Sequence, residues 1–314
     1  MLYCGWDGGG TKTEVAIVDD HGSPVASATF GPLNINGADA ARIRETVSAA
    51  LAFMAAQWGG LPNYGALVVG MAGVSNREAA PRLSAALRDA GWSGPLSIVG
   101  DQEIALSGAI QGHGAVLIAG TGSICFGRDP LGHFFRVGGY GYRIDDVGSG
   151  YAIGRDILTA VVRAGDGRSR PTLLTDLVFS ALGLEDIGSL ITWLYADTTG
   201  KKEIASLARL LESALARQDE AALSIAARSA EDLAELVLTG WRKSGMRDGE
   251  LALTGSILNH NEWIRHQTTL RISSALPALR IREPLASPAI GAARLAFKKA
   301  GTAVDLSQKN ASGY

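Results

Sequence analysis

The chain has 314 residues, of which 46% are apolar, enough for about two domains with buried cores. Its 29 basic and 31 acidic residues give a net charge of −2, which provides no global attraction to nucleic acid or to an anionic membrane. No stretch approaches the ~20 apolar residues that a membrane-spanning helix needs, and Asp7 interrupts the first apolar run, so we expect no membrane span, no signal peptide and a cytoplasmic location.

The first part of the chain alternates strand-like and helical patterns after a glycine-rich start. A short apolar run ends at Asp7, a turn rich in glycine follows, and a second apolar run begins near Thr13. The helix expected next has one apolar face, formed by Ile43, Val47, Ala50, Leu51 and Met54. Around it we expect strands at 25–30, 66–71 and 96–99 and a helix at 77–90.

The second part of the chain repeats this plan. An apolar run at 115–119, a Gly-Thr-Gly-Ser turn, and strands at 124–127 and 133–137 match the start of the chain. The elements expected after them are helices near 149–164, 172–182, 203–216 and 219–243, strand 250–253, helix 262–274, strand 279–282 and helix 288–299. Strands that alternate with helices predict α/β layers, and the duplicated start predicts two similar halves that meet at a cleft. The residues from 302 onward are polar.

The two matched turns are candidate phosphate-binding loops. Glycines let backbone N–H groups approach an anion closely, successive N–H groups form a concave nest, and threonine hydroxyls add donors. A plain tight hairpin is the alternative for either turn alone. The P-loop motif is absent, because Lys12 directly follows Gly-Gly-Gly-Thr. The dinucleotide fingerprint does not fit, because a strand follows the glycines at both turns. The candidate phosphate-binding residues are Gly8, Gly9, Gly10, Thr11, Lys12 and Thr13 in the first loop and Gly120, Thr121 and Gly122 in the second.

Three carboxylates lie at or beyond the ends of apolar runs, where ligands bind in open α/β sheets. Phosphoryl transfer to a hydroxyl needs a metal near the phosphates and a base for the proton. Asp7 suits Mg²⁺, directly or through water, and Asp101 suits the base. The alternatives are a turn residue for Asp7, a helix N-cap for Asp101, and a cap of the helix from Ser149 for Asp145 or Asp146.

Cysteine and histidine carry no recognisable metal site in this sequence. Cys4 and Cys125 are far apart and lie in apolar strand-like runs, so buried free thiols are expected rather than a disulfide. The five histidines show no ligand spacing.

Taken in order, the motifs resemble those of the actin/hexokinase/Hsp70 ATPase superfamily. They are Asp-Gly-Gly-Gly-Thr from Asp7, Asp101 after a strand, Gly-Thr-Gly-Ser from Gly120, Gly-Gly-x-Gly from Gly138, Asp-x-Gly-Ser-Gly from Asp146 and Leu-Thr-Gly-Ser from Leu253. Within the superfamily, residues 1–300 are similar to the BadF/BadG/BcrA/BcrD-type ATPases, whose kinase members include N-acetylglucosamine kinase and glucosamine kinase. The motifs are weak one by one, and their common order and spacing carry the resemblance.

The resemblance implies two ribonuclease-H-like domains, each a mixed sheet flanked by helices, at 1–112 with helix 288–299 and at 113–287. It implies binding of ATP and Mg²⁺, a small amino sugar as substrate, and Asp101 as the base that takes the proton of the sugar 6-hydroxyl. Family members are often dimers, so a homodimer is left open. The sugar contacts implied are Asn34, Asp101, Ser123, Ile124, Gly139, Tyr140, Gly141 and Asp146, and Gly255 and Ser256 would flank the adenosine.

The segment Asp145-Asp146-Val147 departs from the family pattern. N-acetylglucosamine kinases carry a glutamate where this chain has Val147, and glucosamine kinases are similar to this chain in lacking it. An extra carboxylate near the sugar would also suit a protonated 2-amino group. The sequence therefore favours phosphorylation of glucosamine to glucosamine 6-phosphate, with N-acetylglucosamine as the alternative.

Two other functions fit the same resemblance less well. Dehydratase activators of the superfamily carry cluster-ligating cysteines, whose spacing Cys4 and Cys125 lack. Sugar-sensing regulators of the wider superfamily add a DNA-binding extension, and here the first strand starts at once without a basic patch.

Overall fold

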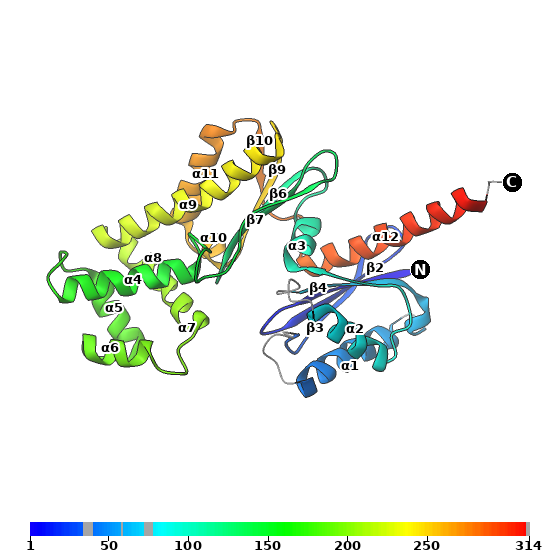
Figure 1. The fold of residues 1–314 in the computed structure, drawn as a ribbon, viewed down its shortest axis with the longest axis horizontal. Coiled ribbons are helices and arrows are strands. Elements are labelled where there is room, and N and C mark those ends of the chain that lie inside the picture. Colours follow the sequence, from blue (N-terminus) through cyan, green and yellow to red (C-terminus); the bar gives the residue numbers. More distant parts are fainter. Residues whose placement is uncertain (34–39, 58, 72–77, 312–314) are drawn as a thin grey trace. The chain divides into compact units, whose positions relative to one another are not determined.

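The computed structural model describes residues 1–33, 40–57, 59–71 and 78–311, and their side chains as far as Gly301. The chain divides into two compact units (Figure 1). Unit 1 consists of Met1–Gln111 together with Pro284–Tyr314, and unit 2 is Gly112–Glu283. Each unit contains one five-stranded mixed sheet flanked by helices.

The sheet of unit 1 has the strand order β3-β2-β1-β4-β5. Its strands are β1 Leu2–Gly8, β2 Thr13–Val18, β3 Pro24–Phe30, β4 Tyr64–Met71 and β5 Leu96–Gly100. The first three strands are antiparallel to one another, and β1, β4 and β5 are parallel. β1 and β4 are buried along almost their whole length, as expected of parallel strands that are covered on both faces.

Helices cover both faces of this sheet. The helical segments are α1 Ala40–Ala56, η1 Leu61–Asn63, α2 Ala79–Asp89, α3 Asp101–Ala109 and α12 Pro288–Ala311. One core joins α1 and α2 to the side chains of β1 and β4 that point toward them, and α3 and α12 contribute to a separate core on the other face. Gly5 permits the second packing, since a Cβ there would lie 2.0 Å from the Ala293 nitrogen of α12.

The sheet of unit 2 has the same topology, with the order β10-β9-β6-β7-β8. Its strands are β6 Gly114–Ala119, β7 Ser123–Arg128, β8 Phe134–Gly138, β9 Gly249–Thr254 and β10 Leu279–Arg282. Here β6, β7 and β8 are antiparallel, whereas β6, β9 and β10 are parallel. The predicted α/β fold with a duplicated plan is therefore confirmed, strand for strand.

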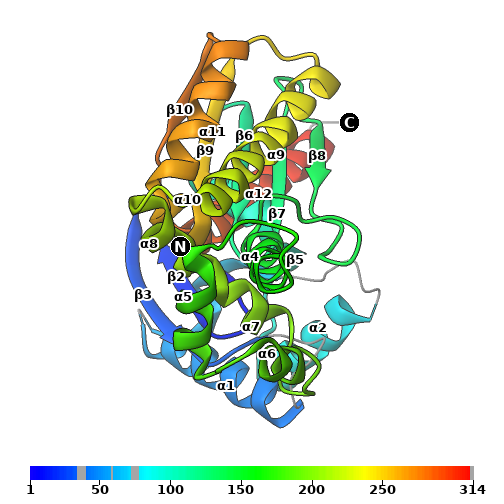
Figure 2. The same ribbon diagram turned by 90° about the vertical axis from the view of Figure 1, so that its left-hand side faces the viewer.

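A large helical layer distinguishes unit 2 (Figure 2). Its members are α4 Gly150–Gly165, α5 Leu173–Leu182, α6 Ile187–Leu194, α7 Lys201–Ser206, η2 Leu207–Arg209, α8 Leu210–Ala216, α9 Glu220–Ser244, α10 Ser256–His260 and α11 Glu262–Ala275. These helices share one continuous core with the sheet. No single described helix is long and apolar enough to cross a bilayer; α5 and α6 pass that test only as a pair bent by 57°.

The helices differ from the sequence predictions in three places. The sequence analysis predicts no helix at α6, although a reciprocal capping box between Asp186 and Ser189 starts one there. The helix expected at 203–216 is divided into α7, η2 and α8, because a 3₁₀ turn interrupts it. α12 continues past its expected end at Lys299 to Ala311. The sequence there holds no proline that would stop it.

Candidate active site

Asp7 and Asp101 lie at one edge of the unit 1 sheet. Asp7 is the second-last residue of β1, and Asp101 is the first residue of α3, directly after β5. The strand between them, β4, pairs Gly70 with Asp7 and Met71 with Gly100. Neighbouring strands are spaced by roughly 4.8 Å, so the two backbones are on the order of 10 Å apart. The carboxyl ends of parallel strands bring these two acids together, as the sequence suggested.

The carboxyl group of Asp7 is electrostatically strained. Its pKa is raised to about 6, first by burial and then by the negative charges of Asp101 and Glu14, against a lowering by Lys12. A partly buried carboxylate among other carboxylates is stabilised by a cation. The described residues contain no group of three or more metal-ligating side chains. One carboxylate of this kind fits Mg²⁺, which keeps several waters and is bound mainly by substrate phosphates.

Asp101 is exposed and is not the N-cap of its helix. Gly100 occupies the N-cap position, so the capping alternative is wrong. Asp101 lies in the first turn of α3, where a negative charge is favoured by the helix dipole, and its Oδ1 accepts a hydrogen bond from the Gln102 amide at 2.9 Å. An exposed carboxylate at a strand end is placed to accept a proton from a ligand.

The first glycine loop is a tight hairpin between β1 and β2. The Gly9 amide donates to the Lys12 carbonyl at 3.0 Å, and the Leu33 amide donates to the Gly9 carbonyl at 3.0 Å. A Cβ on Gly9 would lie 2.9 Å from the Lys12 carbonyl oxygen, so the turn requires glycine there. The residues exposed at its tip are Gly10, Thr11 and Lys12. Gly8 is buried, and Gly9 is only partly covered.

Two hydroxyls expected at ligands face inward instead. Thr13 is fully buried and its Oγ1 donates to the Gly31 carbonyl at 2.8 Å, which ties β2 to the end of β3. Ser123 is 3% exposed and its Oγ donates to the Val147 carbonyl. Each hydroxyl proton is therefore donated within its own unit, and each oxygen can still accept a hydrogen bond. Asn34 lies outside the described residues.

The second glycine loop lies at the carboxyl ends of β6 and β9. The Gly120 amide donates to the Gly122 carbonyl at 2.9 Å, and α4 begins against the loop, with the Gly150 amide donating to the Gly120 carbonyl at 2.7 Å. Ser256 is next to Gly120, since a Cβ on Gly120 would lie 3.9 Å from the Ser256 nitrogen. The exposed parts of this edge include Thr121 and Ser256. Gly150 was not among the expected site residues.

Gly255 makes the turn from β9 into α10. Its φ is +98°, and a Cβ would lie 2.4 Å from the Ala119 carbonyl oxygen. No other residue satisfies both conditions without moving the backbone. Directly beside this turn is a pocket of about 270 Å³. Its lining residues are Ala205, Ser206, Ala208, Arg209, Glu212, Ser256, Ile257, His260 and Asn261.

Asp146 is buried beside the second loop. It has a left-handed backbone with φ of +61° and is 4% exposed. A Cβ on Gly122 would lie 2.8 Å from its Oδ2, so the carboxylate packs on the loop. Lys201 forms an ion pair with it, with 2.8 Å between Nζ and Oδ2. The residue that caps α4 is Ser149, whose Oγ accepts from the Ala152 amide, so the capping alternative for Asp146 is wrong.

The Gly138–Gly141 turn lies against the same region. Gly139 has φ of +76°, and a Cβ there would lie 2.9 Å from Ile124 Cδ1. Tyr140 is 65% exposed, and Asp145 Oδ2 accepts from its amide at 2.9 Å. Gly141 also has positive φ, +101°. The structure thus brings Asp146, Ile124, Gly139 and the second loop together within unit 2. Asp145 serves the turn.

Lys201 is the functional candidate that sequence reasoning missed. It is 55 positions from Asp146 and stands beside another lysine at the start of α7. No local motif distinguishes Lys201 from Lys202, so only the folded chain reveals it.

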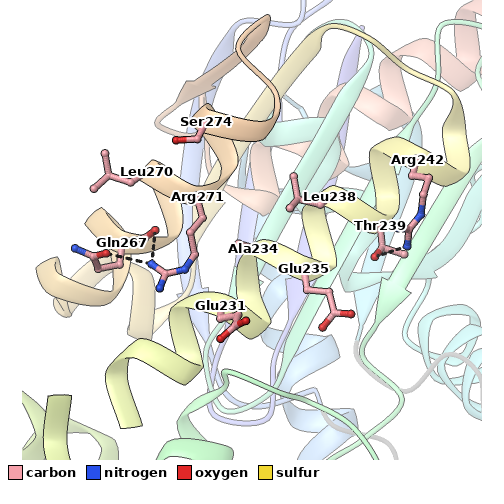
Figure 3. Close-up of a pocket in the computed structure, with 10 residues that line it drawn as sticks. All are labelled: Glu231, Ala234, Glu235, Leu238, Thr239, Arg242, Gln267, Leu270, Arg271 and Ser274. Atoms are coloured by element: carbon pink, nitrogen blue, oxygen red, sulfur yellow. Dashed lines mark hydrogen bonds between the residues drawn. The ribbon is translucent and has the colours of Figure 1, made fainter. Parts of the chain in front are cut away.

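A larger hollow, of about 820 Å³, lies elsewhere in unit 2 between α9 and α11 (Figure 3). It is lined only by the surfaces of these two helices, and its arginines bond within their own helices: Arg271 to Gln267 and Arg242 to Thr239. No strand end or glycine loop contributes to it. It therefore lacks the groups that phosphoryl transfer needs.

Comparison with known proteins identifies the family of this chain. The model of the BadF/BadG/BcrA/BcrD ATPase family matches residues 4–296. The chain belongs to this family. Its two cysteines, Cys4 and Cys125, are free and buried.

The chain is similar to several proteins that are named as sugar kinases. An N-acetylmuramic acid/N-acetylglucosamine kinase of Clostridium acetobutylicum is 30% identical over 93% of this chain and 97% of that protein. A glucosamine kinase of Vibrio cholerae is 30% identical over 83% of this chain and 87% of that protein. The structure of a protein assigned as N-acetylglucosamine kinase from Chromobacterium violaceum is 26% identical, with a TM-score of 0.73 over 94% of this chain and 98% of that chain.

Proposed function

We propose that this protein is an ATP-dependent kinase that phosphorylates the 6-hydroxyl of an amino sugar, glucosamine or its N-acetyl derivative. The observation that carries the proposal is the placement of Asp7 and Asp101 at the carboxyl edge of one sheet, in a family whose named relatives are amino-sugar kinases. Both sugars occur among the relatives, so their names do not decide between them.

Each group has a role in this reaction. Asp101 accepts the proton of the 6-hydroxyl while the oxygen bonds to the γ-phosphorus, and the bond from that phosphorus to the bridging oxygen breaks to release ADP. Backbone N–H groups at the exposed tips of the two loops, at Gly10 and Thr11 in the first and at Thr121 in the second, would hold phosphate oxygens. Mg²⁺ bound with ATP would supply positive charge at the phosphates, and Asp7 is the residue that would hold it.

The pocket beside Gly255 suits the nucleoside. Ala208 and Ile257 provide apolar walls, whereas Arg209 and Ser256 provide polar groups at its margin. Ser256 lies next to Gly120, so a nucleoside bound there would have its phosphates close to the second loop. Neither cysteine is in a disulfide, which is typical of the cytoplasm, and we include a cytoplasmic location in the proposal.

The direct test is a substrate panel. Purified protein with ATP and Mg²⁺ is offered glucosamine, N-acetylglucosamine, glucose and N-acetylmuramic acid, and ADP formation is followed by a coupled assay. We expect turnover on at least one amino sugar, with the phosphate located on oxygen 6 by ³¹P and ¹H NMR. ADP release that does not depend on any sugar would refute the proposal and favour an ATPase function.

The raised pKa of Asp7 predicts that removing its charge stabilises the fold, while the kinase activity is lost. The pKa of Asp7 is about 6 in the folded protein, compared with its ordinary value of 3.8. The free energy of unfolding that the protonated form contributes is therefore fully present below pH 3.8 and is lost as the pH rises through 6. Asp7→Asn, which cannot ionise, should therefore unfold with nearly wild-type free energy at pH 4. At pH 7.5 we expect it to be more stable by roughly 1–3 kcal/mol, since partial exposure screens the effect.

Urea unfolding at both pH values, without nucleotide or Mg²⁺, measures this difference. The same variant should lose most kinase activity. Asp20→Asn, at an exposed carboxylate of the β2–β3 hairpin, is the matched control and should change stability little at either pH. A stability difference for Asp7→Asn that does not vary with pH would contradict the electrostatic explanation.

A further inference from the structure

Lys201 neutralises Asp146, the carboxylate that could otherwise bind the protonated amine of a sugar. The side chain of Asp146 is 5% exposed, and the Lys201 Nζ lies 2.8 Å from its Oδ2. A buried carboxylate is stable as an anion only when a cation or several donors satisfy it. Here Lys201 supplies that cation from within the protein, so the carboxylate does not depend on a ligand for its charge balance.

The neighbouring carboxylate is also satisfied. Asp145 Oδ2 accepts from the Tyr140 amide at 2.9 Å, within the turn that carries Tyr140. Of the two acids that suggested a site for a protonated amine, Asp146 is paired with a cation and Asp145 accepts from a backbone amide. The expectation of a carboxylate available to an ammonium group came from sequence, where neither partner can be seen.

Cationic side chains lie over the aromatic rings of this turn. Lys201 Nζ lies 5.3 Å from the centre of the Tyr142 ring, and Arg143 lies 5.9 Å from the same ring. Arg136 lies 4.6 Å from the centre of the Tyr140 ring and donates to the Gly138 carbonyl at 2.9 Å. Three cationic side chains and two carboxylates thus share this part of unit 2. An ammonium group brought to Asp146 would meet Lys201, a like charge that is already paired with this carboxylate.

We propose that Lys201 is a specificity-determining residue that, by occupying Asp146, selects sugars whose 2-nitrogen is acylated and uncharged over sugars with a protonated amine. The inference rests on the proposed kinase function and on the sugar contact that the family resemblance implies for Asp146. A neutral acetamido group loses nothing beside a lysine, whereas an ammonium group is repelled by Lys201 and meets a carboxylate whose charge is already neutralised. Asp146 stays available to a sugar hydroxyl through its remaining acceptor positions.

The alternative is that Lys201 only anchors α7. A structural anchor would change the kcat/KM of every sugar by the same factor when it is removed. A specificity residue changes the ratio between sugars, so the ratio separates the two roles.

The experiment compares kcat/KM for glucosamine and N-acetylglucosamine with wild type, Lys201→Met and Lys202→Met. Below the pKa of the glucosamine amine, wild type should prefer N-acetylglucosamine. Lys201→Met leaves Asp146 without its cation, so the ratio should shift toward glucosamine by at least about ten-fold. Lys202 is exposed and adjacent, and Lys202→Met should keep the wild-type ratio. Lys201→Arg, which retains the charge, should also keep it.

The pH dependence tests the same idea without any variant. As the pH rises through the pKa of the substrate amine, glucosamine loses its charge and should become a better substrate of wild type relative to N-acetylglucosamine. In Lys201→Met the trend should reverse, because the protonated form is the one that gains a partner. Both sugars share the enzyme, so titration of Asp7 cancels in the ratio.

The possible results distinguish a failure of the proposed function from a failure of the role of Lys201. If no sugar is phosphorylated by wild type, the proposed function itself fails. If wild type prefers protonated glucosamine, or if folded Lys201→Met keeps the wild-type ratio at every pH, the role of Lys201 is overturned while the kinase function stands.

Discussion

Asp101→Asn should lower kcat by about 10²–10⁴ and leave ATP binding within roughly two-fold of wild type. This range is typical of removing a general base, since the amide cannot accept the proton of the attacking hydroxyl. The change keeps the size of the side chain, and Asp101 is exposed on the first turn of α3, so the fold should tolerate it. Steady-state kinetics with the preferred sugar give kcat, and isothermal titration with ATP gives the affinity.

Glu103→Gln is the matched control for this variant. Glu103 is the other acidic residue of the first turn of α3, so its removal changes the helix dipole interaction to a similar extent. We expect its kcat to stay within a few-fold of wild type. If the two variants lost activity equally, the loss would reflect the charge at this end of α3, and Asp101 would not be the base.

The second large effect is expected at Gly255. Alanine there faces two penalties: a backbone with φ of +98°, and a Cβ that would lie 2.4 Å from the Ala119 carbonyl oxygen. The φ penalty alone is of order 1–2 kcal/mol. The clash is with backbone at the end of β6, so the turn must move away from the second phosphate loop. We expect a loss of unfolding free energy above ~2 kcal/mol and an ATP Kd raised by more than ten-fold, measured by urea unfolding and titration calorimetry.

Gly91→Ala separates the two penalties. Gly91 has φ of +103°, and no atom lies within 4 Å of the Cβ position. This variant should show the backbone penalty alone, about 1–2 kcal/mol, with ATP binding unchanged. Equal losses of ATP affinity in both variants would mean that general destabilisation, and not the geometry of the Gly255 turn, controls nucleotide binding.

Asp101 and Gly255 differ in how much the sequence reveals about them. Asp101 could be predicted from sequence, because an acid that follows an apolar run and opens a helix lies at the carboxyl end of a strand. Gly255 was suggested by the family motif, and the structure adds the reason: β9 pairs beside β6, which brings the Ala119 carbonyl over the turn. The sequence pattern locates such turns, and the strand order determines what they touch.

The hydroxyls of Thr13 and Ser123 show what a motif leaves unspecified. Both stand in glycine-rich turns and are chemically able to bind phosphate or sugar. Each instead donates to a carbonyl brought near by a later part of the chain, Gly31 and Val147 respectively. A motif records which groups are present, but hydrogen-bond partners are chosen by the packing of segments that are remote in sequence.

The sequence by itself determined the α/β class, the duplicated strand plan, the two glycine turns and the acids at strand ends. These follow from local physics, namely hydrophobic periodicity, the backbone freedom of glycine and the termination of apolar runs. Only the tertiary structure decided that Asp146 is buried under the second loop, that Lys201 rather than Lys202 neutralises it, and that Gly5 lies against α12. Each depends on which surfaces meet across long separations in the chain, and charge pairing and steric contact act between neighbours in space, not in sequence.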